Sequence, residues 1–408
     1  MSSQWCVQGR IRFGIAVASR VAAFTPHGVL RMKPYRPPSD PHPVREKFAT
    51  ARKELSSALI EREDEVDLVL TALIANEHVL LVGPPGCGKS LLLDAVMNWM
   101  NARKFSILLT KFTCVEEVMG PVSLAALKGD RYRRVTTGRL PEAEVCFIDE
   151  IWKASSAILN TLLKVLNERV FENDGEAVKV PLKLCVAASN EWPSPDSGKE
   201  LTALLDRFLF RKSVRSIGSQ VGRQRLLWHR DHTPKLSTTI TSAEVEHAHR
   251  EVTAVPWSRA AREALETILR ELSREGVVPG DRRQFKTVTA VQAFAFLNGA
   301  DEVLPEHLEV AQHCLWDAHD DQPQKVAQVV AKVANPTGMR VSQLLIEVES
   351  VLSATDVRNL AEAAKAAAKL GEIDKQLSTL SGNGRVEKAR LYLKDQLKKL
   401  KLASIEAV

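Results

Sequence analysis

The sequence predicts an α/β fold in which a parallel sheet is flanked by helices, followed by a region that is helical throughout. The first observation is an apolar run, Val79–Val82, that leads into a glycine-rich loop and then into a helical stretch. The second is a pair of later runs, Val145–Ile148 and Leu184–Ser189, with the continuous apolar character of buried parallel strands. The third is the lack of a strand pattern after residue 216, where apolar residues follow helical spacing.

The glycine-rich loop has the pattern of a phosphate-binding loop. Residues 83–90 read Gly-Pro-Pro-Gly-Cys-Gly-Lys-Ser, which is Gly-x-x-x-x-Gly-Lys-Ser between a predicted strand and a predicted helix. Glycines let successive N–H groups point at phosphate oxygens, and the dipole of the following helix favours negative charge. Lys89 is expected to reach the β- and γ-phosphates, and the Ser90 hydroxyl to bind Mg²⁺. The predicted nucleotide-binding residues are Gly83, Pro84, Pro85, Gly86, Cys87, Gly88, Lys89, Ser90 and Leu91.

Two acids follow the run Val145–Ile148. Carboxylates at the carboxyl end of a parallel strand lie at the sheet edge where such folds bind ligands. Asp149 is predicted to hold Mg²⁺, directly or through water, and Glu150 to polarise the attacking water. Solvated acids at a strand end, or a chance glycine and proline turn, could each give one of the two motifs. Their occurrence together at this separation favours a nucleotide site.

A third polar strand end is Asn190, after the run Leu184–Ser189. Its amide is expected to lie beside the nucleotide, where it can position the water or contact the γ-phosphate. Asn is also a common turn residue, so this signal is weak by itself. Two further features lie downstream, a helix end that carries Arg207 and a helix start that carries Arg282 and Arg283.

These motifs and several other stretches resemble the MoxR branch of the AAA+ ATPases, and most closely its RavA-like members. The resembling stretches lie within residues 45–330 and are Gly83–Ser90, Glu116–Pro121, Leu140–Glu144, Phe147–Ala154, Ala157–Leu163, Asn167–Arg169, Ala187–Glu191, Asp281–Arg283 and Cys314–Trp316. A segment inserted at about 116–140 and a hairpin at Val170–Pro181 also match the branch, and Asn173-Asp174-Gly175 is a strong turn signal for that hairpin. Trp192 departs from the smaller apolar residue that RavA-like chains usually carry there.

The resemblance implies roles for four residues. Asn190 would be the first sensor, Arg207 a finger that reaches the nucleotide of a neighbouring subunit, and Arg282, or else Arg283, the second sensor on a helical lid. Glu150 would orient the water, and ATP would bind between the α/β domain and the lid of one subunit. ATP, rather than GTP, follows from the resemblance alone.

The resemblance also implies an assembly and a class of function. It predicts a homo-oligomeric ring, a hexamer, that works with a partner carrying a von Willebrand factor A (vWA) domain and remodels or matures protein complexes. A nucleic-acid-directed motor, for example in phage defence, is one alternative. A nucleotide-gated assembly scaffold is another, and no residue identifies the substrate.

Charge and cysteine usage limit these choices. Of the 56 basic residues, six lie within residues 1–39, which hold no acid, and the rest of the chain carries 50 basic and 50 acidic residues. The neutral body argues against nucleic acid. The six cysteines are scattered without a Cys-x-x-Cys pair, which is typical of a reduced, cytoplasmic protein, and the histidine pairs lack the companions of a metal site. No apolar stretch approaches the roughly 18 residues of a membrane span.

We predict four segments along the chain. They are a basic, disordered extension at 1–44, an α/β nucleotide-binding domain at 45–215, an all-helical lid at 216–335 and a helical hairpin at 336–408. The extension has the composition of a transit peptide, but a disordered extension or a true start at Met32 fits better. The hairpin either packs on the lid or serves as a docking arm with a basic end at Lys394, Lys398, Lys399 and Lys401.

Overall fold

The computed structural model describes residues 43–193, 199–228, 234–353, 355, 360–380 and 384–406. The predicted N-terminal extension lies outside these residues, except for Pro43 and Val44, which begin the first helix. Within the part of the chain described, no helix is long and apolar enough to cross a membrane.

The centre of the fold is a parallel sheet of five strands. Their order across the sheet is β3 (Lys104–Leu108), β4 (Val145–Asp149), β7 (Leu184–Ser189), β1 (Val79–Val82) and β8 (Phe210–Ser213). Because all five point the same way, their carboxyl ends meet at one edge and their amino ends at the other. The α/β prediction is confirmed, and the three apolar runs that predicted it are β1, β4 and β7.

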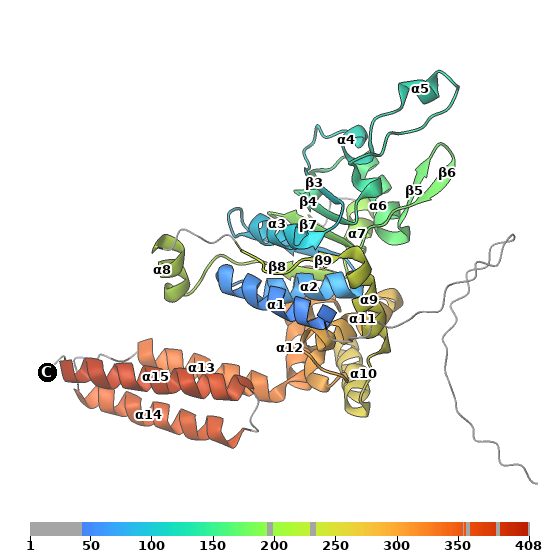
Figure 1. Ribbon diagram of the computed structural model, residues 1–408. Helices are drawn as coiled ribbons and strands as arrows, with labels where there is room; N and C mark the ends of the chain where they lie inside the picture. The colour runs from blue at the N-terminus through green and yellow to red at the C-terminus, as the bar shows by residue number, and fades with distance from the viewer. Residues whose placement is uncertain are drawn as a thin grey trace, which may run out of the picture. The chain divides into compact units, whose positions relative to one another are not determined.

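The two faces of the sheet are covered by different helices (Figure 1). Alternate strand residues face opposite sides, so Leu81 belongs to one apolar core and Leu80 to the other. The helices that contribute to the first core are α1 (Pro43–Ala58), α2 (Glu63–Ala75), α3 (Lys89–Trp99), α9 (Ser242–Ala254), α10 (Arg259–Arg274), α11 (Asp281–Leu297), η3 (Pro305–His313) and α12 (Gln322–Ala334). The elements of the second are α4 (Val115–Met119), η1 (Leu140–Glu142), η2 (Ile151–Lys153), α6 (Ser156–Glu168) and α7 (Lys199–Leu205).

Among its described residues, the predicted lid is helical apart from one short strand. β9 (Ile240–Thr241) pairs in parallel with β2 (Met100–Asn101), the two residues that follow α3. The lid helices α9 and α11 pack directly against α2. The lid therefore shares a continuous apolar core with the helices of the nucleotide-binding region.

The predicted β-hairpin at Val170–Pro181 is present and is hydrogen-bonded to the inserted segment. β5 (Val170–Asn173) pairs antiparallel with β6 (Glu176–Lys179), and the turn residues Asp174 and Gly175 both have positive φ, as this turn type requires. The buried Asn173 side chain accepts from the backbone N–H of Arg134 at 2.7 Å and donates to its carbonyl at 3.1 Å. The inserted segment, which contains α5 (Leu124–Leu127), is thereby fastened to the hairpin.

The helical C-terminal region is confirmed, but the part of it that the structure describes forms three helices where two were predicted. These are α13 (Pro336–Ser353), α14 (Leu360–Thr379) and α15 (Gly384–Glu406), which share a core of their own. The additional helix, α14, is rich in alanine, so its apolar face is a weak signal in the sequence. Of the predicted basic end, Lys394 and Lys398 are exposed and Lys399 pairs with Asp395, whereas the side chain of Lys401 lies outside the description.

Candidate nucleotide site and arginine cluster

The loop after β1 has the curled backbone that the sequence predicted. Gly86 and Gly88 adopt positive φ, and a Cβ on Gly83 would lie 2.2 Å from the Val214 carbonyl oxygen of the neighbouring strand end. Lys89 begins α3, is buried, and donates from Nζ to the Gly83 and Pro84 carbonyls. The ammonium is therefore held inside the curl of the loop, where phosphates would bind.

Three of the predicted site residues lie together at the carboxyl edge of the sheet. Lys89 Nζ lies 3.4 Å from Asn190 Oδ1, and the Asn190 amide donates to the Glu150 carboxylate. Glu150 adopts a left-handed backbone with φ of 54°, and its backbone N–H donates to Asp149 Oδ1 at 2.9 Å. Lys153 Nζ pairs with the second Glu150 oxygen at 3.3 Å. The order of β4, β7 and β1 in the sheet makes this grouping possible.

The residues predicted to hold Mg²⁺ are at the same edge. Ser90 is exposed in the first turn of α3, and Asp149 ends β4. A hydroxyl and a carboxylate are the oxygen donors that Mg²⁺ prefers, with water and phosphate oxygens completing its coordination. The donor set therefore fits the ion.

Beside the loop is a cavity of about 410 Å³ whose lining is largely apolar. It is lined by Ala58, Leu59, Ile60, Arg62, Pro85, Gly86, Cys87, Gly88, Leu91, Ser216, Ile217, Arg223 and Leu226. These residues come from the end of α1 and the α1–α2 turn, from the phosphate loop and the start of α3, and from α8 (Gln220–Trp228) with the segment leading into it. An apolar cavity that opens next to a phosphate-binding loop suits a nucleotide base.

Two residues of the α1–α2 turn fix the walls of this cavity. Arg62 is buried and donates from Nε to the Cys87 carbonyl at 2.9 Å and from a terminal nitrogen to the Arg215 carbonyl at 2.8 Å. Glu61 accepts from the Gly218 N–H at 2.8 Å and from the Ser219 hydroxyl, and that hydroxyl lowers the pKa of the Glu61 carboxyl. Sequence reasoning missed Arg62, because no motif surrounds it.

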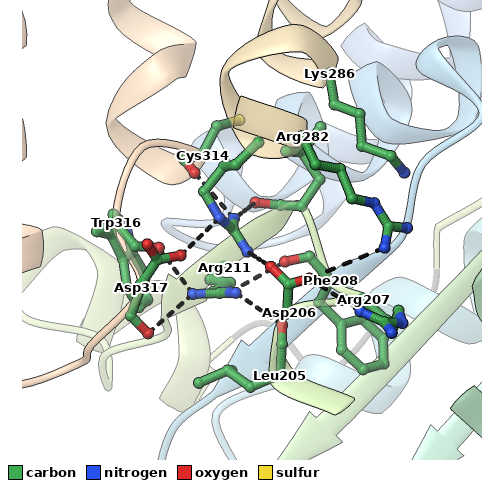
Figure 2. Close-up of polar contacts among 12 residues, drawn as sticks. Leu205, Asp206, Arg207, Phe208, Arg211, Arg282, Lys286, Cys314, Trp316 and Asp317 are labelled. Carbon is green, nitrogen blue, oxygen red and sulfur yellow. Dashed lines mark hydrogen bonds and ion pairs between the residues drawn. The ribbon is translucent and has the colours of Figure 1, made fainter. Parts of the chain in front are cut away.

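A cluster of arginines joins the lid to the segment that enters β8 (Figure 2). Arg211 is buried and donates to the carbonyls of Leu205, Phe208 and Trp316 at 2.8–3.0 Å. Burial and the nearby charge of Arg283 lower the pKa of Arg211 to about 9, which still leaves it charged at neutral pH.

Arg283 is the second buried member of the cluster, with a side chain 3% exposed. It donates to the Leu209 carbonyl at 3.1 Å and the Cys314 carbonyl at 2.9 Å, and pairs with Asp317 at 3.0 Å. Of the two candidates for the second sensor, Arg283 is thus engaged in holding the lid.

The two other arginines are accessible and share one carboxylate. Arg207 pairs with Asp206 at 2.9 Å and is 21% exposed, and Arg282 lies 3.9 Å from the same carboxylate and is 38% exposed. Arg282 also donates to the Asn167 side chain. Within the described chain, the buried Nε of Arg207 has no hydrogen-bond partner. Sequence reasoning missed Asp206, although its position next to Arg207 was a signal.

The arginine cluster lies at the amino edge of the sheet, opposite the phosphate loop. Arg207 precedes β8, which runs parallel to β1, and Lys286 of α11 pairs with Glu77, two residues before β1, at 2.6 Å. The phosphate loop follows the carboxyl end of β1, about 13 Å away along a strand of four residues. The structure therefore does not bring Arg207 or Arg282 to Lys89 of the same chain. Arg282 was expected beside the nucleotide of its own subunit, and the structure places it away from the phosphate loop of that subunit.

The fold and the loop define an AAA+ type of P-loop protein, and comparisons with known proteins agree. A family model described as the MoxR domain of MoxR–vWA–β-propeller ternary systems matches residues 46–250, and an AAA lid domain matches residues 262–330. An uncharacterized protein of Methanocaldococcus jannaschii is 37% identical over 334 residues, covering 81% of this chain and 86% of the relative. A second uncharacterized protein of that organism is 40% identical over 286 residues, covering 70% and 75%.

A solved structure has the same fold. The crystal structure of a candidate ATPase from Cytophaga hutchinsonii superposes with a TM-score of 0.58 at 15% identity, covering 72% of this chain and 95% of that one. The chain belongs to the MoxR family of AAA+ ATPases. The finer prediction of a RavA-like member stays a prediction.

Proposed function

We propose that this chain is an ATP-hydrolysing subunit of a ring, in which each active site is completed by arginines of the next subunit. The observation that carries the proposal is the separation of the two halves of the site. Lys89, Glu150 and Asn190 lie at the carboxyl edge of the sheet, whereas Arg207 and Arg282 lie at the amino edge.

The carboxyl edge supplies the binding and water-activating groups. The loop amides and Lys89 would hold the phosphates, and the apolar cavity would hold the base. Mg²⁺ would be held by Ser90 and Asp149 and would neutralise charge on the β- and γ-phosphates. Glu150 would orient the attacking water, and Asn190, already hydrogen-bonded to Glu150, would keep that carboxylate beside the γ-phosphate.

The amino edge supplies the positive charge that stabilises the leaving phosphate. An arginine finger is worth about 10³–10⁵ in rate where it has been measured, so an isolated subunit should hydrolyse ATP poorly. Arg282 lies on the same edge as Arg207, so we assign both to the neighbour's site. A contact in which one edge meets the opposite edge of the next copy is head-to-tail, and such contacts form a ring when the rotation between copies closes. A hexamer is the size that the family resemblance favours.

The task of the ring follows from the family alone. We propose that it remodels or matures protein complexes together with a partner carrying a vWA domain. The description of the matched MoxR model supports that partner and adds a β-propeller protein as a candidate. A nucleic-acid-directed motor remains the alternative, and stimulation of ATP turnover by DNA or RNA, with a steep salt dependence, would favour it.

The shared site is tested by mixing inactive subunits. ATP turnover should rise with protein concentration and should collapse in Lys89→Ala and in Arg207→Ala. A mixture of these two variants should partly recover, because a subunit with an intact loop then meets a neighbour with an intact finger. Turnover that is independent of concentration and of Arg207 would contradict the proposal.

A second pair of mixtures decides the side on which Arg282 acts. If Arg282 serves the neighbour, Arg282→Ala should recover when mixed with Lys89→Ala. It should not recover when mixed with Arg207→Ala, because every donor edge then lacks one arginine. The reverse pattern would return Arg282 to the nucleotide of its own subunit.

A further inference from the structure

Asp206 is the common partner of the arginines at the amino edge (Figure 2). One of its oxygens accepts from Arg207 at 2.9 Å and lies 3.9 Å from Arg282, while the other pairs with the buried Arg283 at 3.3 Å. Its carboxylate is therefore the link between the two accessible arginines and the anchored one.

The Asp206 carboxylate matters because the positive charges in the cluster outnumber the negative charges. Arg207, Arg282, Arg283 and Arg211 bring four positive charges together, and Lys286 lies one turn after Arg282. The acids that contact the four arginines are Asp206 and Asp317, and Asp317 pairs with Arg283 at 3.0 Å. Without the Asp206 charge, the two accessible guanidinium groups would repel each other and the buried cations at short range.

Asp206 also fixes where the two accessible arginines can be. A free arginine side chain has about 2 kcal/mol of rotamer entropy to lose on being ordered. A carboxylate that is itself held by the buried Arg283 limits that freedom before any phosphate arrives. The segment is fixed further because Arg211 binds the carbonyls of Leu205 and Phe208 on either side of Asp206 and Arg207.

We infer that Asp206 is a positioning residue that presents Arg207 and Arg282 together to the nucleotide of the neighbouring subunit. The inference rests on the proposed shared site. It assigns Asp206 to the donor side of that site, although its carboxylate would not itself contact ATP.

The test is the isosteric variant Asp206→Asn, which removes the charge and keeps the shape. Turnover should fall about 10–100-fold, the order expected when a reacting group is misplaced by about an ångström. Binding of a fluorescent ATP analogue to the loop should be unchanged. Asp206→Glu should restore part of the turnover, because it returns the charge. In an Arg207→Ala background, Asp206→Asn should cause a smaller further loss than in the wild type, because the part of its effect that acts through Arg207 is already absent and only the part through Arg282 remains.

The mixing assay separates positioning from a general structural role. Asp206→Asn should recover with Lys89→Ala and should fail to recover with Arg207→Ala. Asp317→Asn is the matched control, since it also removes a carboxylate from Arg283 but touches neither accessible arginine. Its turnover should stay close to that of the wild type.

Three results would overturn the inference. Full activity of Asp206→Asn would exclude the positioning role, and so would a fall in the turnover of Asp317→Asn equal to that of Asp206→Asn. In either case, recovery of Arg207→Ala mixed with Lys89→Ala would still support the shared site. A failure of that last pair to recover would instead overturn the shared site, and with it the role of Asp206.

Discussion

Arg62 provides a direct test of how the nucleotide cavity is built. The perturbation is Arg62→Met, which keeps the unbranched stem of the side chain as far as the position of Nε and removes its charge and its donors. Arg62 is 7% exposed and binds the phosphate loop at Cys87 and the segment after β8 at Arg215. Methionine would leave both carbonyls without that partner.

The magnitude follows from these two contacts. Hydrogen bonds to a charged group contribute about 1.5–3 kcal/mol each, so their loss sets an upper limit of about 3–6 kcal/mol. Part of that loss should appear as lower stability and part as a looser loop. If about 1.4 kcal/mol of the loss weakens nucleotide binding by the loop, the Kd for nucleotide rises ten-fold.

The assay is titration of a fluorescent ATP analogue in the presence of Mg²⁺. Arg62→Met should raise the Kd about ten-fold, and Arg62→Lys should raise it nearly as much, because one ammonium cannot reproduce the planar fork that reaches two separate carbonyls. Arg225→Met is the control, since Arg225 donates to the Ser57 carbonyl nearby and does not contact the loop. An unchanged Kd for Arg62→Met would refute the reasoning, and a normal Kd for Arg62→Lys alone would show that only the charge matters.

Two further predictions concern pH and the inserted segment. The buried His78 ring accepts from the Cys185 N–H, and burial holds its pKa well below the ordinary value, so below about pH 6.5 the unfolded chain binds a proton that the folded chain does not. The free energy of unfolding should therefore fall by up to about 1.4 kcal/mol per pH unit as the pH drops from 6.5, and urea titrations of His78→Asn should show a shallower dependence. Gly120 has φ of 101°, and a Cβ there would lie 1.9 Å from the Val135 carbonyl oxygen. Gly120→Ala should cost about 1–3 kcal/mol locally and speed proteolysis of residues 116–140, with normal protection there contradicting the argument.

The sequence predicted three of the five strands of the sheet, together with the polar residues at their carboxyl ends, for a physical reason. The strands β1, β4 and β7 are buried on both faces, so each is a continuous apolar run in the sequence. Polar or charged residues follow β4 and β7 and the glycine-rich loop follows β1, so the end of each run also marks the position of candidate site residues. The grouping of Lys89, Glu150 and Asn190 then follows from parallel strands sharing an edge. Contacts made by isolated residues had no such signal, as with Arg62.

The loop after β7 shows how a departure from the family can be explained only in three dimensions. Trp192 was noted in the sequence as unusually large, with no role assigned. Its ring packs edge-on against Trp316, with centroids 5.6 Å apart, and stacks on His319 at 5.3 Å. Trp316 and His319 follow η3, which belongs to the lid region, so the size of Trp192 is accounted for by packing between the sheet edge and the lid.

The placement of the two accessible arginines follows from strand direction more than from their identity. A segment that enters β8 lies at the amino edge, because β8 runs parallel to β1, and the phosphate loop always follows the other end of β1. The pairing of Lys286 with Glu77 brings the start of α11, and with it Arg282, to the same edge. Two arginines that the resemblance assigned to the nucleotides of different subunits thus lie at one edge of the sheet. Only because they lie there together can a single carboxylate, Asp206, contact both.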